Sequence, residues 1–320
     1  MAKLVETVPN FSEGRRIEVV DRLVAAVESV PGAFLLDRTS DPSHNRSVLT
    51  LAGEPAPILE ALERTVAVAV AEIDMERHSG EHPRIGAVDV VPFVPLAGAT
   101  MNDCIELARS FGSRVAERFG IPVYLYGAAA TIPSRERLAD LRRGQYEGLK
   151  VGIGETGRKP DFGRAVLHAT AGAMAVGARP FLIAYNINLD SRDLDLAKRI
   201  ARRIRESSGG LPRVQASGFW IEEIGRAQVS MNLLDFRTTP IWLVWESVRA
   251  EAAEDGVHLA ESELIGLAPL AALLDVADHA GVSARLSQTE RLAGAAAFLK
   301  LRDFSPLQAL ELKLEAAKQR

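Results

Sequence analysis

The sequence contains a single cysteine, Cys104, so it cannot form an internal disulfide bond. Chains of this size without cysteine pairs are typical of reducing compartments, which favours a cytoplasmic location. Cys104 lies in a helical pattern beside Ile105 and Leu107. Free cysteine in such a position usually behaves as a small hydrophobic residue, and we expect it in the core.

The sequence also lacks a basic excess and a long apolar run. Lys and Arg number 38 against 42 Asp and Glu, whereas a nucleic-acid partner requires a surplus of positive charge. The longest stretch without these four residue types, residues 119–134, contains Gly, Pro, Thr and Ser and is shorter than the ~20 apolar residues of a membrane span. The first residues have no apolar signal region. We therefore predict neither nucleic acid nor a membrane as a partner.

The apolar residues that are present suffice for a large core. Hydrophobic residues make up 47% of the 320 residues and charged residues 25%, close to the usual composition of globular proteins. A chain of this length exceeds one ordinary core of about 150 residues, so we expect two subdomains or one large domain.

The periodicity of the sequence repeats one order of elements, strand–helix–strand–strand–helix–strand. In the first half these are predicted at residues 4–8, 17–27, 33–37, 47–52, 58–70 and 87–94, with a further helix over 101–119 and a strand over 122–126. In the second half they are predicted at residues 181–187, 197–204, 214–222, 227–236, 239–253 and 257–265, with Thr239 and Pro240 as the N-cap and first turn of the last helix.

Both halves therefore predict an α+β fold. Each is expected to form a split βαβ unit, of ferredoxin-like βαββαβ order, with helices packed on its sheet. We place an N-terminal subdomain at residues 1–178 and a C-terminal subdomain at residues 179–320. A ligand cleft is expected between them, because pockets favour such interfaces.

The segment between the halves is rich in glycine. Residues 152–157 (GIGETG) match the G-x-G-x-x-G pattern of dinucleotide-binding proteins. That pattern requires a strand before it and a helix opening after it, and neither is predicted here. The glycines over residues 144–163 instead predict one extended loop, and a loop of this length is usually functional or disordered. We favour a segment that covers a ligand.

The densest group of polar residues is the segment 78–84 (HSGEHPR). Its two histidines have the spacing of zinc ligands on a helix, but the glycine and the proline within the segment break such a helix, so we predict no metal site. A loop at the end of a strand is the better interpretation. There His82 can accept and return a proton near neutral pH, with Glu81 or Asp89 to orient it. A solvated or structural histidine is the alternative.

Three other segments carry compatible polarity. Residues 10–14 open the first helix, and they either present its amide groups to an anion or serve only as capping residues. Residues 37–46 form a polar loop, whose alternative role is turn chemistry. One helix of the second half is basic and is either a solvated face or a binding surface for a polycarboxylate. Its basic residues are Lys198, Arg199, Arg202, Arg203 and Arg205.

Several motifs in both halves match one known family. They are residues 8–14 (VPNFSEG), 74–75 (DM), 78–90 (HSGEHPRIGAVDV), 92–95 (PFVP), 122–127 (PVYLYG), 160–163 (PDFG), 177–179 (GAR), 186–189 (NINL) and 228–233 (QVSMNL). In this collinear order, over about residues 3–275, the sequence resembles the glutamate formimidoyltransferase family. Its length is similar to that of the single-function members, so we expect no fused cyclodeaminase domain.

The resemblance implies transfer of a formimidoyl group between 5-formimidoyltetrahydrofolate and L-glutamate, in histidine degradation. It implies tetrahydrofolate as the co-substrate, with no metal and no nucleotide. It also implies a cytoplasmic homodimer, with a separate cyclodeaminase as a further partner.

The resemblance also assigns individual residues. The family's proton acceptor falls on His82, and a further folate contact falls near Arg203. Thr39 stands where an acidic residue is expected, which leaves open whether Asp41 or Asp37 serves the site. The folate-binding stretch falls on Gly163, Arg164, Ala165, Val166, Leu167, His168, Ala169, Thr170, Ala171 and Gly172.

The chemistry of this reaction suggests the remaining roles. The amine of glutamate must lose a proton to attack, N5 of tetrahydrofolate must gain one, and a single histidine can serve both steps. The two carboxylates of glutamate require cationic partners, for which Arg84 and Arg46 are our bidentate candidates. The candidate substrate-binding residues are Asn10, Asp41, Asn45, Arg46 and Arg84.

Three alternatives stay open. The first is a related folate enzyme that transfers a formyl group or uses another amino-acid acceptor. The second is a non-catalytic tetrahydrofolate-binding partner of a cyclodeaminase. The third is a structural module, which would make the polar loop around His82 incidental.

Overall fold

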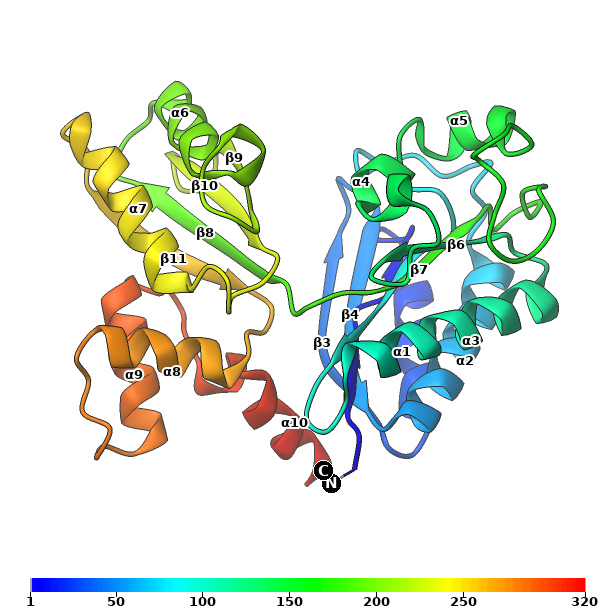
Figure 1. Cartoon of the computed structure of the whole chain (residues 1–320), viewed down its shortest axis with the longest axis horizontal. Helices are drawn as coiled ribbons and strands as arrows, with labels where there is room; N and C mark the ends of the chain where they lie inside the picture. The colour runs from blue at the N-terminus through cyan, green and yellow to red at the C-terminus, as the bar shows by residue number, and fades with distance from the viewer. Residues whose placement is uncertain (1, 320) are drawn as a thin grey trace. The chain divides into compact units, whose positions relative to one another are not determined.

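The computed structural model of the chain describes residues 2–319, which fold into two compact units, Met1–Pro180 and Phe181–Arg320. Each unit combines helices with a sheet of its own (Figure 1), which confirms the predicted α+β class. No helix within residues 2–319 is long and apolar enough to span a bilayer.

The first unit is built on one mixed sheet. Its strands are β1 (Val5–Thr7), β2 (Asn10–Phe11), β3 (Ala33–Asp41), β4 (Arg46–Gly53), β5 (Val88–Pro95), β6 (Val123–Gly127) and β7 (Met174–Ala178). Strands β1 and β2 follow one another between β4 and β5, since both pair with these two strands. The order across the sheet is β3, β4, β1 with β2, β5, β7 and β6. The pairs β5–β7 and β7–β6 are parallel, and the other pairs are antiparallel.

Three long helices cover one face of this sheet (Figure 1): α1 (Ile17–Glu28), α2 (Pro55–Glu72) and α3 (Met101–Phe119). Helix α3 has the predicted bounds, because Thr100 and Asp103 form a capping box at its start and Gly120, with a φ of 68°, ends it. Cys104 is fully buried in α3, as predicted. Burial raises the pKa of its thiol to about 12.

The segment between β6 and β7 differs from its prediction. It contains η1 (Pro133–Arg135), α4 (Leu138–Leu141) and α5 (Gln145–Gly152), so the prediction of one extended loop is wrong. Tyr146 and Leu149 of α5 are buried in the hydrophobic core, and this packing stabilises a helix that its glycines disfavour. Turns follow α5, so the 152–157 motif opens no helix. Strand β7 has no counterpart in the prediction, because its small residues (MAVGA) carry little strand preference.

The second unit is built on an antiparallel sheet. Its strands are β8 (Ile183–Leu189), β9 (Val214–Ile221), β10 (Arg226–Leu233) and β11 (Leu259–Ile265), in the order β11, β8, β10, β9. Helices α6 (Leu194–Ile204) and α7 (Ile241–Glu254) pack on one face of it (Figure 1). The N-cap of α7 is Pro240, not Thr239 as predicted, because the Thr239 hydroxyl donates to the carbonyl of Pro212 at 2.5 Å.

Helical segments complete the second unit beyond β11 without a counterpart in the prediction. They are α8 (Leu270–His279), α9 (Gln288–Leu299), η3 (Pro306–Gln308) and α10 (Leu310–Lys318), and a further short helix, η2 (Glu206–Ser208), follows α6. The start of α9 has a clear signal in the sequence, a capping box formed by Ser287 and Glu290.

Candidate active site

A recess in the first unit brings together four of the predicted site residues. Three segments form it: the end of β2 with the turn after it, the β3–β4 hairpin, and the connection from α2 to β5. The lining residues are Phe11, Ser12, His44, Asn45, Arg46, His78, His82, Arg84 and Asp89. His82 therefore shares one recess with three of the predicted substrate-binding residues.

Asn45 joins the three segments that form the recess. Its side chain accepts a hydrogen bond from the Gly14 amide at 3.0 Å and donates to the Ser79 carbonyl at 3.0 Å. Its own carbonyl accepts from Nε2 of His78 at 3.0 Å. The φ of Asn45 is 48°, in the left-handed region that asparagine tolerates better than most residues. Asn45 thus holds the backbone of the site in place.

His78 has a structural role in this network. Its Nε2 donates to Asn45, and its Nδ1 accepts from Nε of Arg84 at 3.2 Å. Burial lowers the pKa of His78, so the ring is neutral at neutral pH. Both ring nitrogens are therefore engaged in hydrogen bonds.

Within the described part of the chain, no group of three or more His, Cys, Asp or Glu residues is placed to hold a metal ion.

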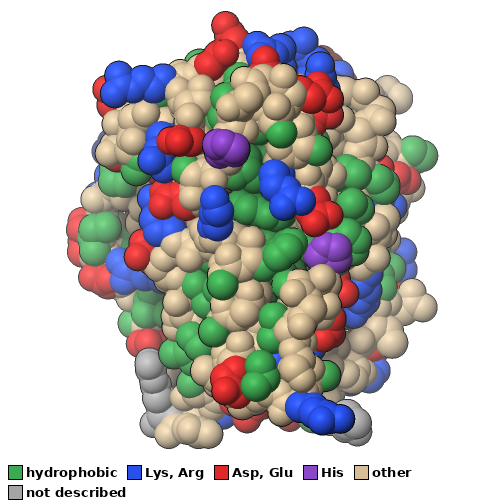
Figure 2. Space-filling view, turned by 90° about the vertical axis from the view of Figure 1, so that its left-hand side faces the viewer, with side chains coloured by type: hydrophobic (Ala, Val, Ile, Leu, Met, Phe, Trp, Pro, Cys, Tyr) green, Lys and Arg blue, Asp and Glu red, His purple; other side chains and the backbone are tan. Residues whose placement is uncertain are grey.

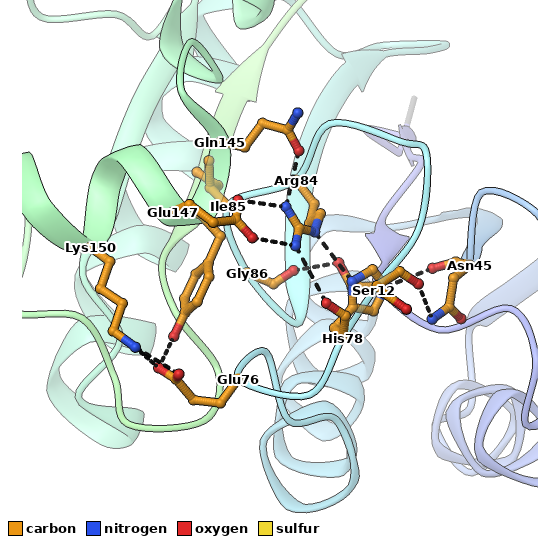
Figure 3. Close-up of polar contacts among 12 residues, drawn as sticks. Ser12, Asn45, Glu76, His78, Arg84, Ile85, Gly86, Gln145, Glu147 and Lys150 are labelled. Atoms are coloured by element: carbon orange, nitrogen blue, oxygen red, sulfur yellow. Dashed lines mark hydrogen bonds and ion pairs between the residues drawn. The ribbon is translucent and has the colours of Figure 1, made fainter.

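Arg84 is held by contacts inside the unit (Figure 3). It is only 7% exposed, and its guanidinium donates to both carboxylate oxygens of Glu147, at 2.7 and 2.9 Å, and to Gln145 at 3.0 Å. A substrate carboxylate at Arg84 would therefore have to displace Glu147, whose side chain is 64% exposed.

Helix α5 is anchored to the connection between α2 and β5 by further contacts (Figure 3). The Tyr146 amide donates to the Arg84 carbonyl at 2.8 Å, and the Tyr146 hydroxyl donates to Glu76 at 2.6 Å. Lys150 pairs with the same Glu76 at 2.5 Å. The segment expected to cover a ligand is thus attached to the loop that carries His82.

Arg46 differs from Arg84 because its guanidinium has no hydrogen-bond or ion-pair partner among residues 2–319. It is half-buried at the start of β4. Burial and the nearby Arg142 lower the pKa of its guanidinium, which remains protonated at neutral pH because the intrinsic pKa of arginine is so high. An unpaired cation in a recess is suited to bind an anion.

Arg142 is a residue of the site that sequence analysis does not identify. Its guanidinium donates to Asp89, a residue 53 positions away that is 2% exposed. Asp89 also accepts from the Ile85 amide at 2.8 Å. Burial raises the pKa of Asp89, and the hydrogen bonds from Arg142 and Ile85 oppose this effect. No local sequence pattern signals a contact between residues so far apart.

His82 carries no hydrogen bond within residues 2–319, so neither Glu81 nor Asp89 orients it here as predicted. Burial, Arg46 and Arg142 lower its pKa to about 3. His82 is therefore a neutral ring beside two cations, and it gains a proton more readily when a negative ligand offsets their charge.

The polar hairpin beside His82 carries Asp41 and His44. Nδ1 of His44 pairs with the Asp41 carboxylate at 2.6 Å, and its amide donates to the same carboxylate at 2.9 Å. Although burial raises the pKa of Asp41, these hydrogen bonds lower it overall. The His44 ring lies edge-on to that of His82, with 6.3 Å between centroids. Of the two acids left open in place of Thr39, Asp41 is the one that acts on His82 electrostatically.

The turn after β2 uses one of its own side chains to bind two of the amide groups that precede α1. The Glu13 carboxylate accepts from the amides of Arg15 and Arg16, at 3.0 and 2.9 Å. It also forms an ion pair with the Arg16 side chain. Asn10 lies in β2 and donates to the Val8 carbonyl at 2.9 Å. The N-cap of α1 is Arg16, without a side-chain capping hydrogen bond, so residues 10–14 do not cap the helix as the alternative expected.

The stretch 163–172 packs directly against the loop that carries His82. The Ala87 amide donates to the Ala171 carbonyl at 2.9 Å, and the Ala173 amide donates to the Ile85 carbonyl at 3.0 Å. Gly86 lies between these contacts, where a Cβ atom would approach the Ala173 carbonyl oxygen to 1.8 Å. Only glycine permits this approach.

Arg203 lies in the other unit, on α6, and is paired with acids of α7. It donates to Glu251 at 2.5 Å and to Glu254 at 2.7 Å, and Arg199 pairs with Asp255 at 3.1 Å. On the face that Figure 2 shows, basic and acidic side chains likewise lie among one another instead of forming a patch of one sign.

Two models of protein families match the chain. The "Formiminotransferase domain, N-terminal subdomain" matches residues 4–179. The "Formiminotransferase domain" matches residues 184–308. Together they cover both units.

Curated relatives agree with these matches. The chain is 47% identical over 279 residues to the glutamate formimidoyltransferase of Streptococcus pyogenes, covering 87% of this chain and 93% of the relative. It is 45% identical over 316 residues to the protein of the same name from Thermoplasma acidophilum, covering 98% of each. It is also 46% identical over 283 residues to the formimidoyltransferase-cyclodeaminase of Rattus norvegicus, covering 87% of this chain and 52% of that protein.

Proposed function

Because this chain belongs to the formiminotransferase family, we propose that it is a glutamate formimidoyltransferase that moves the formimidoyl group between 5-formimidoyltetrahydrofolate and L-glutamate. Relatives of that name that are 45 and 47% identical support the activity. The observation that supports the site is that a neutral His82 and an Arg46 without a hydrogen-bond partner in the described chain line the same recess.

In the proposed mechanism, His82 transfers the protons. The ammonium of glutamate gives up a proton so that its amine can form a bond to the formimidoyl carbon. The resulting tetrahedral adduct then breaks its bond to N5 of tetrahydrofolate, which takes up a proton. A neutral imidazole accepts the first proton and returns the second.

The charges around His82 fit this role once glutamate is bound. In the ligand-free chain, Arg46 and Arg142 contribute to the low pKa of His82. A carboxylate bound at Arg46 offsets one of these positive charges and shifts the pKa of His82 back toward its usual value of about 6.5. The acceptor thereby prepares the base that removes its own proton.

The folate is proposed to bind along residues 163–172. The hydrogen bond from the Ala87 amide to the Ala171 carbonyl supports a place for this stretch beside the His82 loop. This proposal has four further parts: a folate contact at Arg203, a ligand cleft between two split βαβ subdomains (1–178 and 179–320), a homodimer, and a separate cyclodeaminase as partner. Arg203 would act on folate only after exchanging its contacts with Glu251 and Glu254.

The test is formation of N-formimidoylglutamate by the purified protein. Wild-type protein should form it from glutamate and 5-formimidoyltetrahydrofolate. His82→Ala should lower kcat at least about a hundredfold, the usual contribution of a general base. Binding of tetrahydrofolate should stay within about twofold, since His82 moves protons and need not hold the folate.

A matched control is His258→Ala, which removes an exposed histidine outside the recess. It should retain wild-type turnover. Wild-type turnover in His82→Ala would remove His82 from the proposed role. Tight folate binding without product would instead favour a non-catalytic partner of a cyclodeaminase, and faster reaction with a formyl donor or another acceptor would favour a related enzyme.

A further inference from the structure

The arginines around the recess differ in how many of their hydrogen-bond donors are used. A guanidinium has five N–H donors. All three nitrogens of Arg84 donate to neighbouring groups. Among residues 2–319, Arg46 has no partner for its guanidinium and Arg142 has one, Asp89. Arg46 and Arg142 therefore retain donors for a ligand, whereas Arg84 does not.

Arg142 lies behind one of the residues that line the recess. It follows α4, and its guanidinium donates to Asp89, which lines the recess. Its side chain is 13% exposed, and its Nε is buried without a hydrogen-bond partner in the part of the chain described. Buried donors of this kind are rare in native proteins, and each requires an explanation. A carboxylate in the recess would provide one.

The acids of the recess are engaged by groups other than Arg46. Asp89 is engaged by Arg142, and Asp41 is held by His44 at 2.6 Å. No acid within residues 2–319 pairs with Arg46. The recess thus combines the guanidinium of Arg46, which has no ion-pair partner among these residues, with that of Arg142, which keeps unused donors. This arrangement is suited to a small ligand with two carboxylates.

We propose that Arg46 and Arg142 together bind the two carboxylates of the amino-acid acceptor, and that Arg142 sets the preference for a dicarboxylic acid. This inference rests on the proposed function. It gives Arg84 the role of holding α5 through Glu147, in place of the carboxylate contact expected from the sequence. It also means that the segment between β6 and β7 supplies part of the acceptor site.

The experiment compares glutamate with glutamine, in which a neutral amide replaces one carboxylate. The KM for glutamate and the ratio of kcat/KM for the two acceptors are measured for wild type, Arg142→Met and Arg142→Lys. Arg142→Met should raise the KM for glutamate about 10- to 100-fold, as expected for the loss of a charge-assisted hydrogen bond. It should lower the preference for glutamate by a similar factor and leave the KM for the folate within about twofold.

The lysine variant tests geometry as well as charge. Arg142→Lys keeps a cation beside the buried Asp89, so the fold retains its ion pair. A single ammonium cannot serve Asp89 and a carboxylate as a guanidinium does, so the preference for glutamate should still fall about 10-fold. Arg143→Met is the matched control. The side chain of Arg143 is next to Arg142 in sequence, is 80% exposed and pairs with Asp140 at 2.8 Å. The Arg143→Met variant should therefore retain the wild-type KM and preference for glutamate.

Removal of Arg142 alone leaves Asp89 buried without a cation, which destabilises proteins. A double variant, Arg142→Met with Asp89→Asn, removes both charges and should fold with the same loss of preference. Wild-type preference for glutamate in any folded Arg142 variant would overturn the inference. An inactive wild type would refute the proposed function itself, whereas an active wild type with unchanged variants would refute only this assignment.

Discussion

The recess of the first unit can be compared with a polar cluster on the sheet of the second unit. The members of this polar cluster are Asn186, Asn188, Gln228, Glu261, Glu263 and Arg302. Gln228 donates to Asn188 at 2.9 Å and to Glu263 at 3.2 Å. Arg302 pairs with both glutamates of the cluster. Each charged member thus has a partner of opposite charge within the second unit.

The recess has a similar composition but differs in the pairing of its arginines. It too combines asparagine, buried acid and arginine, yet Arg46 has no partner among residues 2–319. Residue types alone therefore do not separate a polar group that holds a fold together from one that binds a ligand. Unused hydrogen-bond donors do, because native proteins otherwise satisfy buried polar groups.

The largest expected effect comes from replacing one arginine of each region with methionine, in separate variants. Arg46→Met should raise the KM for glutamate about 100-fold, since an ion pair with the substrate is lost, while the free energy of unfolding changes by less than about 0.5 kcal/mol. Arg302→Met should leave the KM for glutamate unchanged and should lower the stability of the fold. It leaves two glutamates without a cation and should lower the free energy of unfolding by about 1 kcal/mol. Steady-state kinetics and urea denaturation measure the two effects.

This comparison depends on the separation of the two effects. A large loss of stability in Arg46→Met, with an unchanged KM, would mean that Arg46 supports the fold and does not bind substrate. Both variants should keep the far-ultraviolet circular dichroism of the wild type.

An intermediate effect is expected inside the polar cluster. Gln228 is 5% exposed, and Gln228→Leu leaves the buried Asn188 side chain without its donor. The free energy of unfolding should fall by about 1–3 kcal/mol. Gln215→Leu is the control, because it makes the same chemical change at an exposed position of the neighbouring strand β9, and it should change stability by less than about 0.5 kcal/mol. Equal losses in the two variants would show that the cluster contributes no stability.

The smallest expected effect is on the pH dependence of stability. The pKa of His82 is about 3 in the folded chain and about 6.5 in an unfolded one. Between these values the unfolded chain binds a proton that the folded chain does not, so stability falls as the pH is lowered. Between pH 7 and pH 5, the full shift corresponds to about 2 kcal/mol. Because His82 is partly exposed, solvent screening reduces this value, and wild type should lose about 1 kcal/mol more than His82→Gln.

Urea denaturation at several pH values provides this measurement. Arg46→Met should also reduce the pH dependence, because removal of that cation raises the pKa of His82. Identical pH dependence in wild type and His82→Gln would contradict the low pKa of His82.

The sequence predicts those parts of the fold whose signals are local. Helix α3 has its capping box and its terminal glycine within the segment itself, so its bounds follow from the sequence. Helix α5 does not, because its glycines suggest a loop and its stability comes from contacts such as Glu147 with Arg84. Strand β7 is defined by parallel pairing with β5 and β6, which no local pattern records.

The same distinction applies to the site. The segment around His82 is continuous in the chain, so its polar character can be predicted from the sequence alone. The contact between Asp89 and Arg142 spans 53 residues, and the unpaired state of Arg46 depends on where every nearby acid lies. Charge balance is a property of the folded chain, and the sequence cannot supply it.

The close approach at Gly86 has a consequence for motion. A Cβ atom there would lie 1.8 Å from the Ala173 carbonyl oxygen, so the two backbones touch with no side chain between them. Hydrogen bonds on either side of Gly86 join Ala87 to Ala171, in the proposed folate stretch, and Ile85 to Ala173, just beyond it. If either of these two backbone segments moves away, both hydrogen bonds between them break. In hydrogen exchange the amides of Ala87 and Ala173 would become accessible together, as a single cooperative unit.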